Sequence, residues 1–337
     1  MKFHLYAALL RQDIAFLKKL FSKFKSSKDG KFGDYINETH FGGDLPLFSA
    51  ISFGNVELVK LLLENGANPN IRNKYGGFPL HEASYKGHDS IVELLLKRGA
   101  DPDVRDKHGD VPLRTALLWK HYGTAELLLK YHANPNIQDA CGDVPLYKAF
   151  ILGHDSVVEL LLENGANPNI QDKHSNFLLY QAFSWKRDSI VKLLLEHGAD
   201  PNIQNEHGEF LLYEACSKGR DNIVKLLLEH GADPNIKNEH GESLLYEACS
   251  KKRDSIVKLL LENGADPDIK DQKGKTPLSF VFEDRFLYKS NVGIVELLLE
   301  HDANPNVKDQ KGKSLFYYII DSYSDIDHYQ VVELLLD

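Results

Sequence analysis

Hydrophobic positions recur along the chain with a period of 33 residues. The triplet Leu-Leu-Leu begins at positions 61, 94, 127, 160, 193, 226 and 259, and then at 297 and 334. An Asn-Pro or Asp-Pro dipeptide keeps the same register, with proline at 69, 102, 135, 168, 201, 234 and 267, and then at 305. A fixed period of this length indicates an array of repeats rather than a few separate globular domains.

One period, residues 205–237, shows the elements that each repeat encodes. A turn sequence opens it, and the mostly apolar segment 210–216 predicts a short helix that Gly219 can end. An acidic residue then precedes the apolar segment 223–230, which predicts a second helix, and Gly231 is expected to follow it in a left-handed conformation. Neither helix can bury its apolar face alone, so the repeats must stack on one another.

This pattern resembles the ankyrin repeat, a β-turn plus two helices with the signature Thr-Pro-Leu-His-x-Ala. The matching segments are Phe-Pro-Leu-His-Glu-Ala at 78–83, Val-Pro-Leu-Arg-Thr-Ala at 111–116 and Val-Pro-Leu-Tyr-Lys-Ala at 144–149. The resemblance implies an all-α solenoid of stacked helix-turn-helix units with β-turn fingers. We assign residues 1–39 to a degenerate N-terminal capping repeat and a polar linker, and residues 40–337 to the array. The units are 40–72, 73–105, 106–138, 139–171, 172–204, 205–237, 238–270, 271–308 and 309–337.

Several units depart from the family signature. Tyrosine takes the histidine position in four successive units, at 147, 180, 213 and 246. We predict that these rings pack between units in place of the polar clamp that the family builds there. His132 and Asp302 replace the glycine that ends the second helix, and Ser175 replaces a turn glycine, so we expect a positive φ at all three.

The composition excludes several classes of protein. The chain of 337 residues carries 40 Lys+Arg against 49 Asp+Glu, a net charge of -9, which argues against a nucleic-acid binder. Three cysteines are too few for a disulfide framework, and we see neither a signal peptide nor a membrane-spanning segment, so we expect the cytoplasm or another reducing compartment. The sequence also lacks motifs for a catalytic nucleophile, a metal or a cofactor, and the histidines at turn tips are expected to be solvated. We therefore expect a non-catalytic protein that is monomeric.

The two ends differ from the middle. Residues 1–31 hold eight basic and two acidic residues, a net charge of +6. Their helical apolar spacing fits a capping repeat with a lysine-rich outer face, and it also fits a basic amphipathic helix that contacts a membrane. The last two units carry insertions, around 284–292 and 321–328, which are either surface extensions or an edge of the binding site.

The candidate binding residues lie at the end of the first helix of each unit. In ankyrin proteins, that helix face and the turn tips line a concave groove that receives the partner, and large apolar residues stand there in five successive units. They are Phe53, Tyr85, Leu118, Trp119, Ile151, Leu152 and Trp185. Asp110 and Asp143 lie beside them at turn tips, in an acidic border that continues with Asp44, Glu209 and Glu242. Leu118 and Ile151 can alternatively belong to the core between units.

These residues predict a scaffold that binds another protein through the concave face of the array. The preferred partner would offer an apolar segment flanked by basic residues. The alternative is a membrane- or host-targeted effector that uses the basic N-terminal helix and acts in a host cytosol. An enzyme is disfavoured, because only about 39 residues lie outside the array.

Overall fold

The computed structural model describes residues 2–25, 35–39, 44–138, 142–172, 174–238, 240–283, 289–308, 312–314 and 317. The chain divides into two compact units, residues 1–167 (unit 1) and residues 168–337 (unit 2), and each is described by itself. The expected insertion at 321–328 lies outside the described residues. Of the expected insertion at 284–292, only residues 289–292 are described, and they begin a helix.

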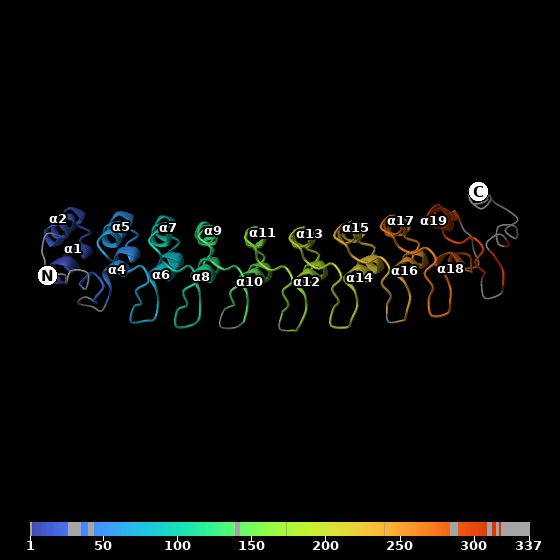
Figure 1. Cartoon of the computed structure of the whole chain (residues 1–337), viewed down its shortest axis with the longest axis horizontal. Coiled ribbons are helices and arrows are strands. Elements are labelled where there is room, and N and C mark those ends of the chain that lie inside the picture. Colours follow the sequence, from blue (N-terminus) through green and yellow to red (C-terminus); the bar gives the residue numbers. More distant parts are fainter. Residues whose placement is uncertain are drawn as a thin grey trace. The chain divides into compact units, whose positions relative to one another are not determined.

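Both units are built from pairs of short antiparallel helices, and a hairpin loop joins each pair to the next (Figure 1). Unit 1 contains α1 (Lys2–Leu10), α2 (Ile14–Lys25), α4 (Pro46–Ser52), α5 (Val56–Glu64), α6 (Pro79–Lys86), α7 (Asp89–Lys97), α8 (Pro112–Leu118), α9 (Tyr122–Lys130), α10 (Pro145–Ile151) and α11 (Asp155–Glu163). Unit 2 contains α12 (Leu178–Ser184), α13 (Asp188–Glu196), α14 (Leu211–Lys218), α15 (Asp221–Glu229), α16 (Leu244–Ser250), α17 (Asp254–Glu262), α18 (Pro277–Glu283) and α19 (Lys289–Glu300). The all-α repeat architecture that the periodicity predicts is confirmed.

The core of each unit lies between the two helices of a pair and between neighbouring pairs. In the pair α14 and α15, the first helix buries Leu211, Leu212 and Ala215. The second helix buries Ile223, Val224, Leu227 and Leu228. The α14 helix ends at Gly219 with φ 64°, and Gly231 follows α15 with φ 88°, so the helix end predicted at Gly219 and the left-handed conformation predicted for Gly231 are confirmed. Because each pair is only two short helices, burial of these faces requires the next pair.

The positions expected to hold a positive φ without glycine do so. His132 and Asp302 both have φ 66°, and Ser175 has φ 64°. Such conformations cost free energy in residues other than glycine, and histidine and aspartate tolerate them better than bulky residues.

A hydrogen-bonded row of asparagines joins successive repeats at their hairpins. The Asn202 amide donates to the Gly231 carbonyl at 3.2 Å and accepts from the Asp233 backbone N–H at 2.9 Å. The same two bonds are made by Asn37, Asn70, Asn136, Asn169 and Asn235. Asn37 lies in the segment expected to be a polar linker, so that part of the segment already forms a repeat-like contact.

The row changes where the facing glycine is absent. Asp103 and Asp268 take the asparagine position, and the residues facing them one repeat later are His132 and Asp302. Each aspartate keeps the accepting half of the bridge: Asp103 accepts from the Asn134 backbone N–H at 2.9 Å, and Asp268 accepts from that of Asn304 at 3.0 Å. A carboxylate has no proton to donate to a carbonyl, so the second bond of the bridge is lost at both places.

The lost bond predicts the effect of one substitution. Asp103→Asn should stabilise the chain by about 1 kcal/mol, because the new amide donates to the backbone carbonyl of His132 while its oxygen still accepts from the Asn134 N–H. Urea unfolding of the wild type and the variant measures the gain. A variant that is no more stable than the wild type would show that the donated bond contributes nothing here.

The tyrosine row packs between repeats, and its hydroxyls form polar contacts there. Tyr180 is buried, and its hydroxyl donates to Glu214 of the next repeat and accepts from Asn205 at 3.0 Å. Tyr213 accepts from Asn238 at 2.9 Å in the same way. Burial is the main cause that raises the pKa of both hydroxyls, and nearby glutamates raise the pKa further. Tyr180 and Tyr213 therefore pack between repeats as expected, and their hydroxyls add polar bridges that the sequence did not indicate.

His81 is the one histidine of the signature that remains, and it is buried in α6. Its Nε2–H donates to the Asp110 carbonyl at 2.8 Å, whereas its Nδ1 is buried without a hydrogen-bond partner among the described residues. Protonation would put an unpaired N–H into this site, so desolvation lowers the pKa of His81, although Asp106 and Asp110 partly oppose the shift.

The lowered pKa predicts that His81 makes the fold acid-sensitive. The neutral ring contributes stability above the unfolded-state pKa of about 6.5, and this contribution is lost as pH falls below it, because the unfolded chain then binds the proton more strongly. Urea unfolding between pH 7.5 and 5 should show a smaller loss of stability for His81→Gln than for the wild type. His207→Gln, at an exposed turn tip, is the matched control and should keep the wild-type slope.

Candidate protein-binding surface

Large apolar side chains stand exposed at the ends of the first helices of unit 1. We call this set the apolar row; it comprises Phe53, Tyr85, Leu118, Trp119, Ile151 and Leu152. Phe53, Trp119 and Leu152 directly follow the last residues of α4, α8 and α10, where the chain leaves the helix and neighbouring helices cover the side chains only in part. The row therefore results from apolar residues at a helix-end position that most soluble proteins fill with polar ones.

Leu118 and Ile151 belong to this exposed surface and not to the core. Their exposed fractions are 56% and 40%, so the alternative that they tilt between repeats is wrong. Each is the last residue of its helix, and the residues that fill the core lie one position earlier, at the buried Leu117 and Phe150. A shift of one position turns a helical side chain by about 100°, which is enough to move it from core to surface.

Within the apolar row, the Trp119 ring contacts the Tyr85 ring of the preceding repeat. Their ring centroids are 4.8 Å apart with planes at 81°, an edge-to-face arrangement. Such a contact fixes the orientation of both rings before any partner arrives. A preordered aromatic surface loses less side-chain entropy on binding than a mobile one.

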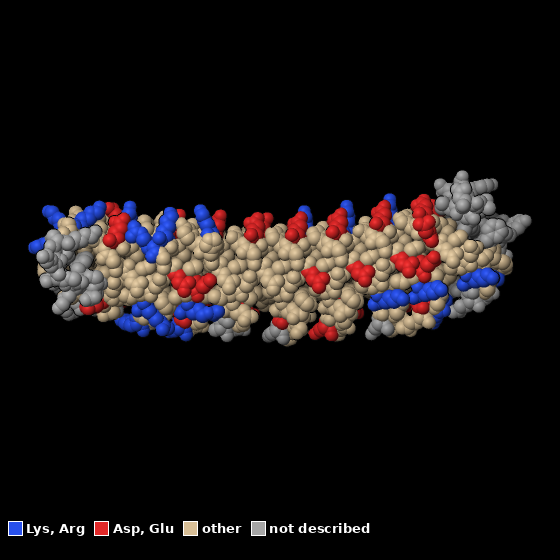
Figure 2. Space-filling view, viewed as in Figure 1, with Lys and Arg blue, Asp and Glu red and all other residues tan. Residues whose placement is uncertain are grey.

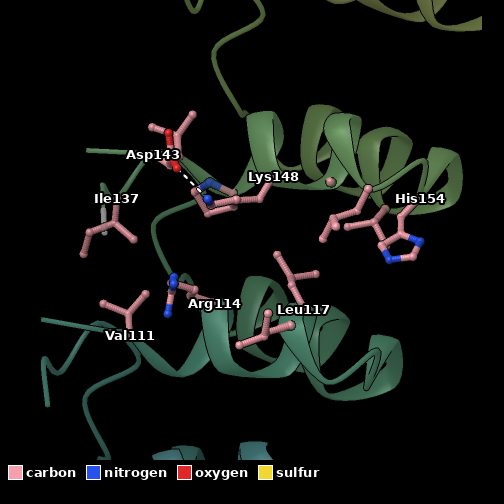
Figure 3. A pocket seen from close by; sticks show the side chains of 13 residues that line it. Val111, Arg114, Leu117, Ile137, Asp143, Lys148 and His154 are labelled. Carbon is pink, nitrogen blue, oxygen red and sulfur yellow. Dashed lines mark ion pairs between the residues drawn. The ribbon is translucent and has the colours of Figure 1, made fainter. Parts of the chain in front are cut away.

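An apolar crevice opens between α8 and α10, next to the row (Figure 3). It has a volume of about 40 Å³, and its walls are almost entirely apolar. Its lining includes Val111, Leu117, Leu118, Val144, Ala149, Leu152 and Val157. Figure 3 shows Arg114, Asp143 and Lys148 at one end of the crevice and His154 at the other.

The side chains of the two repeats account for the crevice. Val111 and Val144 stand at the position that Phe78, Phe177 and Phe210 occupy in other repeats, so less volume fills this interface. Across it lie Arg114 and Lys148, at the positions where Tyr180 and Glu214 are hydrogen-bonded in unit 2. Two cations at these positions cannot pair with each other, so each turns to an aspartate instead.

The expected acidic border is neutralised at its centre. Asp110 pairs with Arg114 at 2.6 Å, and Asp143 pairs with Lys148 at 2.5 Å. In unit 2, Glu209 and Glu242 accept from the asparagines of their own hairpins at 2.7 and 2.9 Å. These carboxylates hold the hairpins, so the apolar row is the stronger candidate for partner contact than Asp110 and Asp143.

Trp185 is exposed in unit 2 at the repeat position that Trp119 holds in unit 1. It directly follows the last residue of α12. In the next repeats of unit 2 this position holds Lys218 and Lys251, which pair with Glu214 and Glu247. Within the described part of unit 2, the helix-end surface beyond Trp185 is therefore polar.

Figure 2 shows many Lys, Arg, Asp and Glu side chains along the edges of the face in view, and further acidic side chains between them amid other residues. The two cysteines that the structure describes take no part in this surface. Cys216 and Cys249 are buried, and burial raises the pKa of both thiols, so neither is a reactive thiolate. Among the described residues there is no group of three side chains that could hold a metal, and no helix is long and apolar enough to cross a membrane.

The sequence did not reveal a second cavity, which lies between α1, α4 and the hairpin before α6. Its lining includes Tyr6, Asp44, Phe53, Tyr75 and Glu82. These residues belong to the N-terminal helix pair and to the two repeats that follow it, so the repeat register of the sequence does not indicate that they meet. Tyr75 alone offers a signal, since a tyrosine stands at a turn tip where four other repeats have histidine.

A comparison with models of protein families agrees with this architecture. The family model described as ankyrin repeats (3 copies) matches residues 4–106, 47–139, 113–205, 178–271 and 245–337. A search of curated proteins found no significant match. Among solved structures, the chain is similar to the ankyrin repeat domain of Bcl-3, described as a unique member of the IkappaB protein family. The identity is 31% over 65% of this chain and 98% of that chain, with a TM-score of 0.49.

Proposed function

Since the chain belongs to the ankyrin-repeat family, we propose that this interaction scaffold is non-catalytic and binds a partner protein through the apolar row of unit 1. The surface presents six large apolar side chains with no covering element among the described residues. Exposed apolar sets of this kind, with aromatic anchors, mark sites of protein contact. The exposure of the row is the observation that carries the proposal.

The crevice between α8 and α10 gives the row a place for an anchor. Leu118 and Leu152 belong both to the row and to the crevice lining. A partner residue that enters there would exchange water for apolar walls, at about 25 cal/mol per Å² of buried apolar surface. Binding energy in interfaces concentrates at such desolvated pockets.

The basic N-terminal helix is a weaker candidate for partner contact. Leu17 and Phe21 of α2 are buried, and α2 packs against α5. Lys18 also pairs with Glu57 of α5 at 2.8 Å. An apolar face that already covers the first helix pairs is unavailable to a membrane unless the helix detaches, so we propose that these helices cap the array.

Affinity capture tests the proposed function. The full chain, immobilised, should retain specific proteins from a lysate, and the variant Trp119→Ala should lose them while keeping the wild-type circular dichroism spectrum. Glu126→Ala, on the exposed side of α9, is the control and should retain the same proteins. An identical set of captured proteins on both columns would place the binding surface elsewhere.

A further inference from the structure

The second cavity has the composition of a site for a cation. It has a volume of about 300 Å³, enough for one long side chain, and it opens to solvent beside Phe53, the first residue of the apolar row. Aromatic rings come from three elements, with Tyr6 on α1, Phe53 after α4 and Tyr75 on the hairpin. Two carboxylates, Asp44 and Glu82, also line it.

Neither carboxylate forms a close ion pair with the described part of the chain. Asp44 is exposed and makes no ion pair or hydrogen bond with the described part of the chain. Glu82 accepts from the Ser52 hydroxyl at 3.1 Å and lies 3.7 Å from the Lys86 ammonium, a loose pair within one helix. Both carboxylates can therefore accept further hydrogen bonds from a ligand.

The chain itself stacks a cation on one of these rings. The Lys74 ammonium lies 4.9 Å from the centroid of Tyr75, whose ring is 62% exposed. Attraction of a cation to an aromatic face is weak at an exposed site, and lysine is strongly hydrated, so a better-matched cation can displace Lys74. The lining then carries two negative charges against the one positive charge of Lys74.

We propose that this cavity binds an arginine side chain of the partner protein. The planar guanidinium stacks on Tyr75 and donates hydrogen bonds to Asp44 and Glu82, and its alkyl stem lies along Phe53. Arginine fits better than lysine because its flat, weakly hydrated group can stack on a ring and bond carboxylates at once.

The position of the cavity also defines the order of residues in the partner. Phe53 lines the cavity and begins the apolar row, so the arginine precedes or follows apolar residues that lie toward Tyr85 and Trp119. The assignment of the arginine to a protein rests on the proposed function. The cavity itself can be tested without any partner.

The test is a titration of the isotope-labelled full chain with N-acetyl-arginine amide, followed by NMR. The matched probe is N-acetyl-citrulline amide, which has the same shape without the charge. Arginine should shift amide signals of residues 44–54 and 73–77 along a saturating curve, and citrulline should bind at least about tenfold more weakly. Equal binding of the two probes, shifts at other residues only, or tighter binding of N-acetyl-lysine amide would overturn the proposal.

Variants separate this site from general charge attraction. Asp44→Asn and Glu82→Gln should each weaken arginine binding by about tenfold, and Lys74→Ala should strengthen it because the competing ammonium is gone. Glu126→Gln removes a distant exposed carboxylate and should leave binding unchanged. Unchanged binding in both carboxylate variants refutes the site and leaves the scaffold function intact, whereas failure of the capture experiment leaves this titration interpretable.

Discussion

Replacement of Phe183 by alanine is expected to lower the free energy of unfolding by about 3–5 kcal/mol. Phe183 is fully buried in α12, and the Arg220 guanidinium of the next repeat lies 4.3 Å from its ring centroid. Arg220 also donates to the Phe183 carbonyl at 2.7 Å and pairs with Asp188. The substitution therefore opens a cavity and removes the ring that holds this arginine between two repeats.

Urea unfolding followed by circular dichroism measures this loss, either as a lower midpoint or as an early separate transition of the repeats around α12. Phe183→Leu is the matched control, since it keeps most of the volume and should cost less than about 1.5 kcal/mol. Trp185→Ala, two residues away but exposed, should change stability by no more than about 0.5 kcal/mol. Equal effects of the three substitutions would contradict the assignment of Phe183 to the core.

Trp119→Ala is expected to weaken binding of a captured partner by about 2 kcal/mol or more, which is about a 30-fold rise in Kd. Trp119 is 51% exposed and held edge-on by Tyr85, so the substitution removes preordered apolar surface from the binding face and little from the core. The free energy of unfolding should change by less than about 1 kcal/mol.

Isothermal titration calorimetry with the partner found by capture gives the affinity. Trp119→Phe tests whether an aromatic anchor suffices and should recover part of the loss, whereas Glu126→Ala should bind as the wild type does. If Trp119→Ala binds normally while remaining folded, the apolar row is not the interface. If the variant unfolds, Trp119 is needed for stability and is not a residue of the binding surface alone.

Much of the fold follows from the local sequence. The first helices begin at Pro79, Pro112 and Pro145, where proline suits the first turn, and Gly231 supplies the left-handed residue that ends a second helix. These choices depend on backbone preferences within one repeat. The positive φ of His132 was predictable for the same reason, because its repeat position fixes the backbone conformation.

The candidate surface was only partly predictable. The repeat register placed Phe53 and Trp119 at exposed helix ends, and the structure agrees. The register could not decide whether Leu118 is core or surface, since one position along a helix separates the two. It also gave no indication that Asp110 would be paired with Arg114, because side-chain pairing depends on distances within the folded repeat.

The sequence by itself determined that this protein is an array of 33-residue helical repeats with large apolar residues at the helix ends of one part of the chain. Periodicity and local backbone preference suffice for that, since every repeat carries the same pattern of apolar and turn residues. Only the tertiary structure decided that Tyr180 bridges two repeats through its hydroxyl, that a crevice opens between α8 and α10, and that Asp44, Tyr75 and Glu82 meet in one cavity. Those features join residues of different repeats, and their geometry depends on side-chain volumes and charges that the period does not specify.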